Sequence, residues 1–232
     1  MSAKHQYYYP CRDLTTPEEK LILRDLAAIM TSDENAEKFR NAVDAQYKSK
    51  YYKQNYFETW IDKSQSDKLA SSWAGIDSPA LEVNDLAKEY IGVIETIVSR
   101  YGGDNWRLMV SLNDEHCLPI HKDPKGGPIA NCSIPITPDY AFYRPTNFYA
   151  EVDDESLVFQ ADYNKFKSPC LINMRKFHNA GNHTAERKLG IYNGKSVAIQ
   201  VMYNKPYADV KKFFSSKGWL STSEYRGEWG LT

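Results

Sequence analysis

Two potential metal ligands stand two residues apart in the pentapeptide Pro119-Ile120-His121-Lys122-Asp123, and a further histidine, His178, follows much later in the chain. On a strand or at its end, residues i and i+2 project from one face, so the His121 imidazole and the Asp123 carboxylate can reach one cation together. His178, arriving from a distant strand, would complete a set of two histidines and one carboxylate. Such a facial set leaves adjacent coordination positions open, which is diagnostic of non-haem Fe(II) oxygenase chemistry.

A His-x-Asp tripeptide is by itself a weak signal, because a hydrogen-bonded His–Asp pair in a loop has the same spacing. His116 follows two acidic residues and is expected in a solvated turn, while His183 stands in an evident loop. We therefore take His178, which follows an apolar run, as the third ligand. A structural zinc site is a minor alternative, because it favours paired Cys or His spacing that this chain lacks.

The first hundred residues read as helical. A capping box formed by Thr16 and Glu19 predicts a helix over residues 17–31, with a proline at its first position. A second amphipathic helix is expected over residues 33–45. The clearest helix begins after Asn84 and ends at a Tyr-Gly-Gly stop, and its apolar residues recur at core spacing. This last helix should back a sheet.

From Trp106 onward the pattern changes to short runs typical of strands, separated by Gly, Pro, Asn and Asp. The dipeptide Asn193-Gly194 is a strong signal for a two-residue hairpin between residues 188–192 and 195–203. A short helix is expected over residues 209–216. The predicted strands span residues 106–112, 131–137, 148–152, 157–162, 170–178 and 196–203.

Many short strands behind a helical prefix predict an α+β fold with a double-stranded β-helix (jelly-roll) core braced by N-terminal helices. We divide the chain into a helical N-terminal region packed on the core (1–103), the jelly-roll core (104–206), and a C-terminal helix and tail (207–232). No internal repeat or Pro- or Gly-rich linker separates these parts, so they should form one structural domain.

Charge and cysteine content narrow the classes of partner and compartment. The 29 basic and 30 acidic residues nearly balance, which argues against a nucleic-acid partner. No run approaches the roughly twenty apolar residues of a membrane span, so we expect no membrane association. The 4 cysteines lack CxxC spacing and the N-terminus lacks the apolar run of a signal peptide, so we expect a reduced, cytoplasmic protein.

The order of a strand, a His-x-Asp motif, several strands and a single later histidine resembles the Fe(II)/2-oxoglutarate-dependent dioxygenase superfamily, whose jelly-roll core holds iron in this manner. The resemblance covers residues 104–206. The segments Asn-Cys-Ser-Ile-Pro-Ile (131–136) and Leu-Ile-Asn (171–173) are most similar to the aspartyl/asparaginyl and prolyl hydroxylase-like branch. The resemblance implies a catalytic Fe(II) held by His121, Asp123 and His178.

The resemblance also implies 2-oxoglutarate as cosubstrate, with a fixed cation for its far carboxylate near the start of the last barrel strand. Arg187 follows His178 at close to the superfamily's usual interval and offers a bidentate guanidinium group. Lys195 directly precedes the terminal strand and shares parity with its apolar residues Val197, Ile199 and Val201. We favour Lys195 on register and keep Arg187 as the alternative. Tyr143, Tyr149 or Asn131 could add a hydrogen bond to either carboxylate.

The implied activity is O₂-dependent hydroxylation of a small molecule or of an amino-acid or protein side chain, in which iron and 2-oxoglutarate carry the oxidative chemistry and the protein supplies orientation. A nucleic-acid demethylase of the same superfamily would need paired arginines after the distal histidine, and Arg187 alone is no such pair. A cupin-like module that binds a metal or ligand without turnover would usually show His-x-His followed by a near Glu. No sequence pattern identifies the primary substrate.

Overall fold

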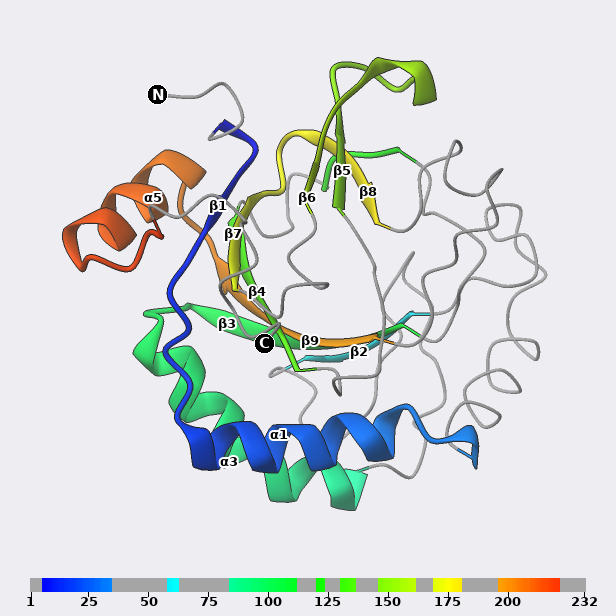
Figure 1. Ribbon diagram of the computed structural model, residues 1–232, viewed down its shortest axis with the longest axis vertical. Coiled ribbons are helices and arrows are strands. Elements are labelled where there is room, and N and C mark those ends of the chain that lie inside the picture. The colour runs from blue at the N-terminus through cyan, green and yellow to red at the C-terminus, as the bar shows by residue number, and fades with distance from the viewer. Residues whose placement is uncertain are drawn as a thin grey trace, which may run out of the picture.

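The computed structural model describes residues 6–34, 58–62, 84–111, 120–123, 130–136, 146–161, 169–180 and 196–221. Within them, helices cover one face of a six-stranded sheet, and a three-stranded sheet lies toward its other face (Figure 1). All strand pairs described in both sheets are antiparallel. This mixture of helices and antiparallel sheets agrees with the predicted α+β class. No helix of the described segments is long and apolar enough to cross a lipid bilayer.

The two helices that the structure describes in the first hundred residues form where the sequence places their start and stop signals. α1 (Pro17–Met30) begins with the predicted capping box, in which the Thr16 hydroxyl accepts from the Glu19 N–H and the Glu19 carboxylate accepts from the Thr16 N–H. α3 (Asn84–Arg100) is followed by Gly102, whose φ of 67° is the left-handed conformation that favours glycine just beyond a helix end. Both helices pack under the larger sheet, as predicted for the second of them (Figure 1).

The larger sheet has the strand order β1-β7-β4-β9-β3-β2. Its central strand β9 pairs with β4 on one edge and with β3 on the other. The strands, in sheet order, are β1 (Tyr8–Pro10), β7 (Cys170–Asn173), β4 (Ala130–Pro135), β9 (Ser196–Tyr203), β3 (Asn105–Ser111) and β2 (Glu58–Asp62).

The smaller sheet has the order β6-β5-β8. It is built from β5 (Thr146–Tyr149), β6 (Leu157–Ala161) and β8 (Phe177–Ala180), and a short 3₁₀ turn, η3 (Asp154–Ser156), lies between β5 and β6. An isolated antiparallel bridge joins His121 to His178 of β8. The segment around His121 therefore continues the smaller sheet beyond β8.

Side-chain alternation divides the buried apolar residues of the described segments into two clusters. Alternate residues of β4 and β9 pack against the helices in a large core that includes Trp106 of β3 and Phe214 of α5 (Tyr207–Ser216). The residues of opposite parity on β4 and β9 face the smaller sheet. On this side a second cluster joins Phe148 of β5 to Ile172 of β7 and to Met174. The two sheets are therefore packed on one another through this second cluster.

The predicted strand over residues 170–178 is wrong, because the chain turns within it. The Asn173 side chain accepts from the Arg175 N–H, and the Lys176 N–H donates to the Asn173 carbonyl, so β7 ends in a tight turn before β8 starts. The two strands belong to different sheets. This turn carries the chain from the larger sheet to the smaller one immediately before His178.

Other predicted elements are confirmed, shifted or missed. The predicted strand 196–203 matches β9, and the C-terminal helix matches α5 with a slightly earlier start. The strand expected over 148–152 is shifted, since β5 ends at Tyr149. The helical interpretation of the first hundred residues misses β1 and β2, which lie at the two edges of the larger sheet.

The predicted Asn193-Gly194 hairpin needs a free edge of the last strand. Both edges of β9 are already paired from Ala198 to Met202, so neither edge of this stretch can accept such a partner. Residues 181–195 and most of the predicted helix over 33–45 lie outside the described residues.

Gly103 is expected to be intolerant of any side chain. A Cβ at this position would lie 2.2 Å from Val201 Cγ1 and 3.2 Å from Val98 Cγ1, and both valines belong to the helix-facing core. We expect Gly103→Ala to lower the free energy of unfolding by about 1–3 kcal/mol, as overpacking of a core does. Urea unfolding followed by circular dichroism measures this.

Gly92 provides the matched control for Gly103. It lies in α3, and a Cβ there would meet no atom within 4 Å. Gly92→Ala should therefore stabilise the protein by about 0.5–1 kcal/mol, because alanine favours the helix. Equal stability of the two variants would contradict the packing described around Gly103.

Candidate metal centre

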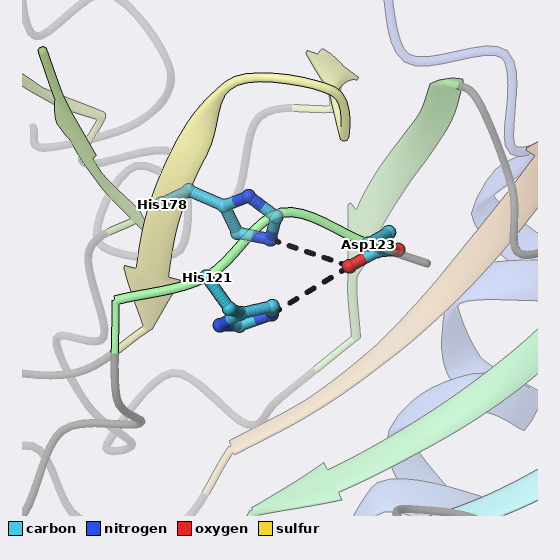
Figure 2. Close-up of side chains that lie close together, drawn as sticks. All are labelled: His121, Asp123 and His178. Carbon is cyan, nitrogen blue, oxygen red and sulfur yellow. Dashed lines mark ion pairs between the residues drawn. The ribbon is translucent and has the colours of Figure 1, made fainter. Parts of the chain in front are cut away.

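The structure brings His121, Asp123 and His178 together (Figure 2). His121 Nε2 lies 3.6 Å and His178 Nε2 lies 3.7 Å from Asp123 Oδ1. One ligand atom from each of the three residues lies within 4.8 Å of the others. Both nitrogen–oxygen distances are too long for a good hydrogen bond, yet short enough for the atoms to be bridged by a cation with ligand bonds of about 2.1 Å.

A reciprocal backbone ladder holds the two histidines side by side. The His121 N–H donates to the His178 carbonyl at 2.9 Å, and the His178 N–H donates to the His121 carbonyl at 2.8 Å. Directly paired residues on neighbouring antiparallel strands project from the same face. The ring centroids are accordingly 4.5 Å apart. The approach of the two imidazoles therefore follows from strand pairing between remote parts of the chain.

The His178 ring is held in one tautomer. Its Nδ1 lies 2.9 Å from the Lys176 carbonyl oxygen, which can only accept a hydrogen bond, so we assign the proton to Nδ1. The unprotonated Nε2 then points toward Asp123 (Figure 2). A backbone carbonyl behind a histidine ligand fixes ring orientation in this way in many metal sites.

Burial keeps His178 uncharged. Desolvation, with a further contribution from nearby His121, lowers the pKa of His178 to about 4, although the Asp123 carboxylate and the Lys176 carbonyl oppose the shift. The imidazole is therefore neutral at neutral pH, and its contact with Asp123 is no ion pair there. Neutral imidazole is the protonation state that binds metals.

The backbone of Asp123 is tied to the turn that precedes β8. The Asp123 N–H donates to the Met174 carbonyl at 3.2 Å, and Arg175 Nη1 donates to the Asp123 carbonyl at 2.8 Å. Neither bond uses the Asp123 carboxylate, which is left for a metal. The turn between β7 and β8 thus holds Asp123 through hydrogen bonds to the Asp123 backbone. The same turn leads directly into β8, which carries His178.

The donor set fits a divalent transition metal. Two imidazole nitrogens and one carboxylate oxygen form the 2-His-1-carboxylate combination with open positions that non-haem Fe(II) sites use. Among the described residues, this is the sole group of three or more His, Cys, Asp or Glu side chains close enough to share a metal. Three buried cysteines, Cys11, Cys132 and Cys170, are not in disulfides and do not join it.

Of the residues predicted to bind 2-oxoglutarate, the structure describes Asn131 and Tyr149. Lys195, Arg187 and Tyr143 lie outside the described residues. Asn131 is fully buried on β4, and its Nδ2 lies 3.0 Å from Met174 Sδ. The Tyr149 hydroxyl instead donates to Asn179 Oδ1, on the face of β5 opposite to Phe148.

The strand register observed for β9 does not support the choice of Lys195. That choice assumes that residues sharing the parity of Lys195 on β9 face the metal ligands. Those residues, Val197, Ile199 and Val201, instead pack in the helix-facing core. The residues that face the smaller sheet have the opposite parity and include Gln200. Strand parity therefore gives no support to Lys195 over Arg187.

Arg175 is the residue at the site that sequence reasoning misses. Arg175 acts by donating to the Asp123 carbonyl, which is remote in sequence, and no local motif predicts this contact. We expect Arg175→Met to lower the affinity for Co(II) or Fe(II) by about 10-fold, as loss of an outer-shell contact does. Removal of a positive charge would by itself strengthen the binding of a metal cation. A lower metal affinity in Arg175→Met would therefore show that Arg175 acts by positioning Asp123. Isothermal titration calorimetry with the purified chain measures the affinity.

The adjacent Lys176→Met variant is the matched control for Arg175→Met. It removes the same charge from the same turn, but the Lys176 contact with the site is through its backbone carbonyl, which the substitution retains. We expect its metal affinity to stay unchanged or to rise slightly. Equal weakening in both variants would exclude a specific role for the Arg175–Asp123 bond.

No family model matches this chain, and no curated protein sequence matches it either. Solved structures with a similar arrangement include a prolyl-4-hydroxylase from Pseudomonas putida, with 9% identity and a TM-score of 0.37 over 85% of this chain and 92% of that one. AviO1 from Streptomyces viridochromogenes has 15% identity and a TM-score of 0.37, covering 86% and 91% of the two chains. The Fe(II)/α-ketoglutarate-dependent dioxygenase TqaL has 8% identity and a TM-score of 0.30, covering 82% and 91%. These identities and TM-scores are too low to indicate a function for this chain.

Proposed function

We propose that this protein is an Fe(II)- and 2-oxoglutarate-dependent oxygenase that hydroxylates a small molecule or an amino-acid side chain. The observation that carries the proposal is the convergence of His121, Asp123 and His178, with ligand atoms within 4.8 Å of one another. Two neutral nitrogens and one carboxylate are the ligands that such chemistry requires. The specific branch, with aspartyl/asparaginyl or prolyl hydroxylase-like enzymes, is part of the proposal.

The strand order supports a double-stranded β-helix for the core. In such a barrel, two antiparallel sheets face each other and the chain passes repeatedly from one to the other. Here β3, β4, β7 and β9 lie in one sheet, and the His121 bridge, β5, β6 and β8 lie in the other. We propose residues 104–206 as this core, with the metal ligands at the end of the smaller sheet.

The described residues would bind the metal and limit the access of water to it. His121 and His178 would supply imidazole nitrogens, Asp123 would supply a carboxylate oxygen, and the Lys176 carbonyl holds the His178 ring. The Phe148 ring lies 6.4 Å from the His178 ring, centroid to centroid, and is fully buried. An apolar wall of this kind keeps solvent from one side of a metal site.

With iron and 2-oxoglutarate bound, the site would supply oxidative chemistry in which one oxygen atom of O₂ enters the substrate as a hydroxyl group, the other enters succinate, and CO₂ is released. Lys195 and Arg187 both remain proposals for the cation that holds the far carboxylate of 2-oxoglutarate. The primary substrate is either a small molecule or a peptide side chain.

Succinate release tests the proposal. Purified protein loaded anaerobically with Fe(II) should convert 2-oxoglutarate to succinate when O₂ is admitted, even without its primary substrate, at a slow uncoupled rate. Asp123→Ala should give none. Stoichiometric metal binding without any succinate, also in the presence of candidate amino-acid and peptide substrates, would favour the cupin-like binding module instead.

A further inference from the structure

Lys122 stands between two of the proposed metal ligands, and its side chain lies over the ring of Phe177. The distance from Lys122 Nζ to the centroid of that ring is 3.8 Å. A cation over the face of an aromatic ring is attracted by the ring quadrupole. Phe177 directly precedes His178 in β8. The Lys122–Phe177 pair therefore joins the two segments of chain that carry the three ligands.

The Lys122–Phe177 pair lies on the face of the smaller sheet that looks away from the metal ligands. His121 is bonded directly to His178 in an antiparallel bridge, so the next residue, Lys122, lies opposite Phe177. Successive residues of an extended chain project from alternate faces. The two imidazoles thus meet on one face, and the ammonium group and the phenyl ring meet on the other. A substitution in the pair therefore removes no ligand atom.

On the same face, β8 is also joined to β5 through side chains. Tyr149 of β5 is the cross-strand partner of Phe177, and its hydroxyl donates to Asn179 Oδ1. Asn179 Oδ1 also accepts from Asn147 Nδ2 at 2.9 Å. Buried hydrogen bonds therefore hold β8 to β5, and the Lys122–Phe177 pair is the corresponding contact on the other edge of β8.

The backbone pairing that the Lys122–Phe177 pair supports is short. His121 and His178 form an isolated bridge with two backbone hydrogen bonds, whereas β8 pairs with β5 along its whole length. Such a bridge opens at lower cost than a continuous strand pair, because fewer bonds break. When it opens, His121 moves away from His178, and the ligands cannot share a metal. The observed metal affinity is then reduced in proportion to the closed fraction.

We propose that Lys122 and Phe177 are positioning residues of the metal centre, because the ammonium group over the ring keeps the His121–His178 bridge closed before a metal binds. This inference rests on the proposed function and adds to it two residues that act through the ligands. Lys122 is exposed and Phe177 is half-buried, so substitutions in the pair leave the core intact.

A double-substitution cycle tests the pair. Calorimetry gives the Co(II) affinity of the full-length chain, of Lys122→Met, of Phe177→Leu and of the double variant. Phe177→Leu should weaken Co(II) binding by about 2- to 5-fold, the range of a cation–π contact at an exposed site. Lys122→Met also removes a positive charge, which by itself strengthens cation binding in both backgrounds. Its effect should therefore be about 2- to 5-fold more favourable to Co(II) in the Phe177→Leu background than in the unmodified protein.

Two further variants serve as controls. Lys122→Arg should retain the Co(II) affinity, because a guanidinium group also lies over aromatic rings and carries the same charge. Lys211→Met removes a cation that lies 5.5 Å from the centroid of the Tyr9 ring, on α5 and so on the helix side of the larger sheet. It should leave the Co(II) affinity unchanged.

The outcomes separate the inference from the proposed function. A merely structural contact would lower the free energy of unfolding of the metal-free protein, measured with urea and a chelator, and leave the Co(II) affinity of Phe177→Leu unchanged. That result, or a cycle without coupling, overturns the inference while the proposed function stands. If the unmodified protein binds neither Co(II) nor Fe(II), the proposed function fails and the inference fails with it. Coupling between Lys122 and Phe177 in metal affinity supports the inference.

Discussion

Asp123→Ala is expected to abolish both Fe(II) binding and 2-oxoglutarate turnover. Asp123 contributes the sole carboxylate of the three-residue group, and its oxygen lies within 3.7 Å of both histidine nitrogens. Loss of an outer-shell partner already costs 10–100-fold in metal affinity, so loss of a ligand should cost more than about 100-fold. Calorimetric titration with Fe(II) without O₂, together with a succinate assay, measures the two effects.

The variant should fold, because the bonds that tie residue 123 to the turn before β8 are made by its backbone. His178→Ala should give the same double loss. Asp209→Ala is the control, since Asp209 is an exposed carboxylate at the start of α5, on the helix side of the larger sheet. Turnover that persists in Asp123→Ala would remove the basis of the oxygenase proposal.

The metal-free protein is expected to lose roughly 3 kcal/mol of stability through His178 alone as the pH falls from 6.5 to 4. Burial lowers the pKa of His178 to about 4 in the folded state, while an unfolded chain takes up the proton near 6.5. Between these values the unfolded state binds more protons than the folded state. Stability therefore rises with pH in this window and is fully regained above it.

Denaturant unfolding at a series of pH values, with a chelator present, measures this dependence. His178→Gln is the comparison, because it has no titrating group and should show a flatter profile over the same window. Groups that do not contact His178 contribute equally to both proteins; Glu19, for example, has its pKa lowered by the hydrogen bond from Arg100, and its contribution is lost as the pH falls further. Parallel profiles for the two proteins would show that His178 is not held neutral by burial.

Several features of this protein follow from the sequence alone because the interactions that determine them are local. The capping box of Thr16 and Glu19 sets the start of α1, and a glycine at positive φ ends α3. The apolar run of β9 is recognised without reference to its neighbours. The two-residue spacing of His121 and Asp123 likewise predicts a shared ligand role, since it depends only on the geometry of an extended backbone.

Strand direction and sheet membership could not be predicted, because they depend on partners remote in sequence. The run over residues 170–178 reads as one strand, but the Asn173 turn divides it between two sheets. The parity of β9 shows which residues share a face, but not which face meets the helices. Packing against α1 and α3 decides which face of β9 meets the helices. The face that shares the parity of Lys195 meets them, so strand register does not favour Lys195.

The sequence by itself determined which residue types are available for metal chemistry, since the spacing of His121 and Asp123 and the apolar run before His178 are local properties. The tertiary structure alone decided that His178 meets them, through a reciprocal backbone ladder between two segments far apart in the chain. It also decided that Arg175 holds the Asp123 backbone and that Lys122 lies over Phe177. The physical reason is that hydrogen-bond ladders and packing join residues by position in space, which local sequence patterns do not encode.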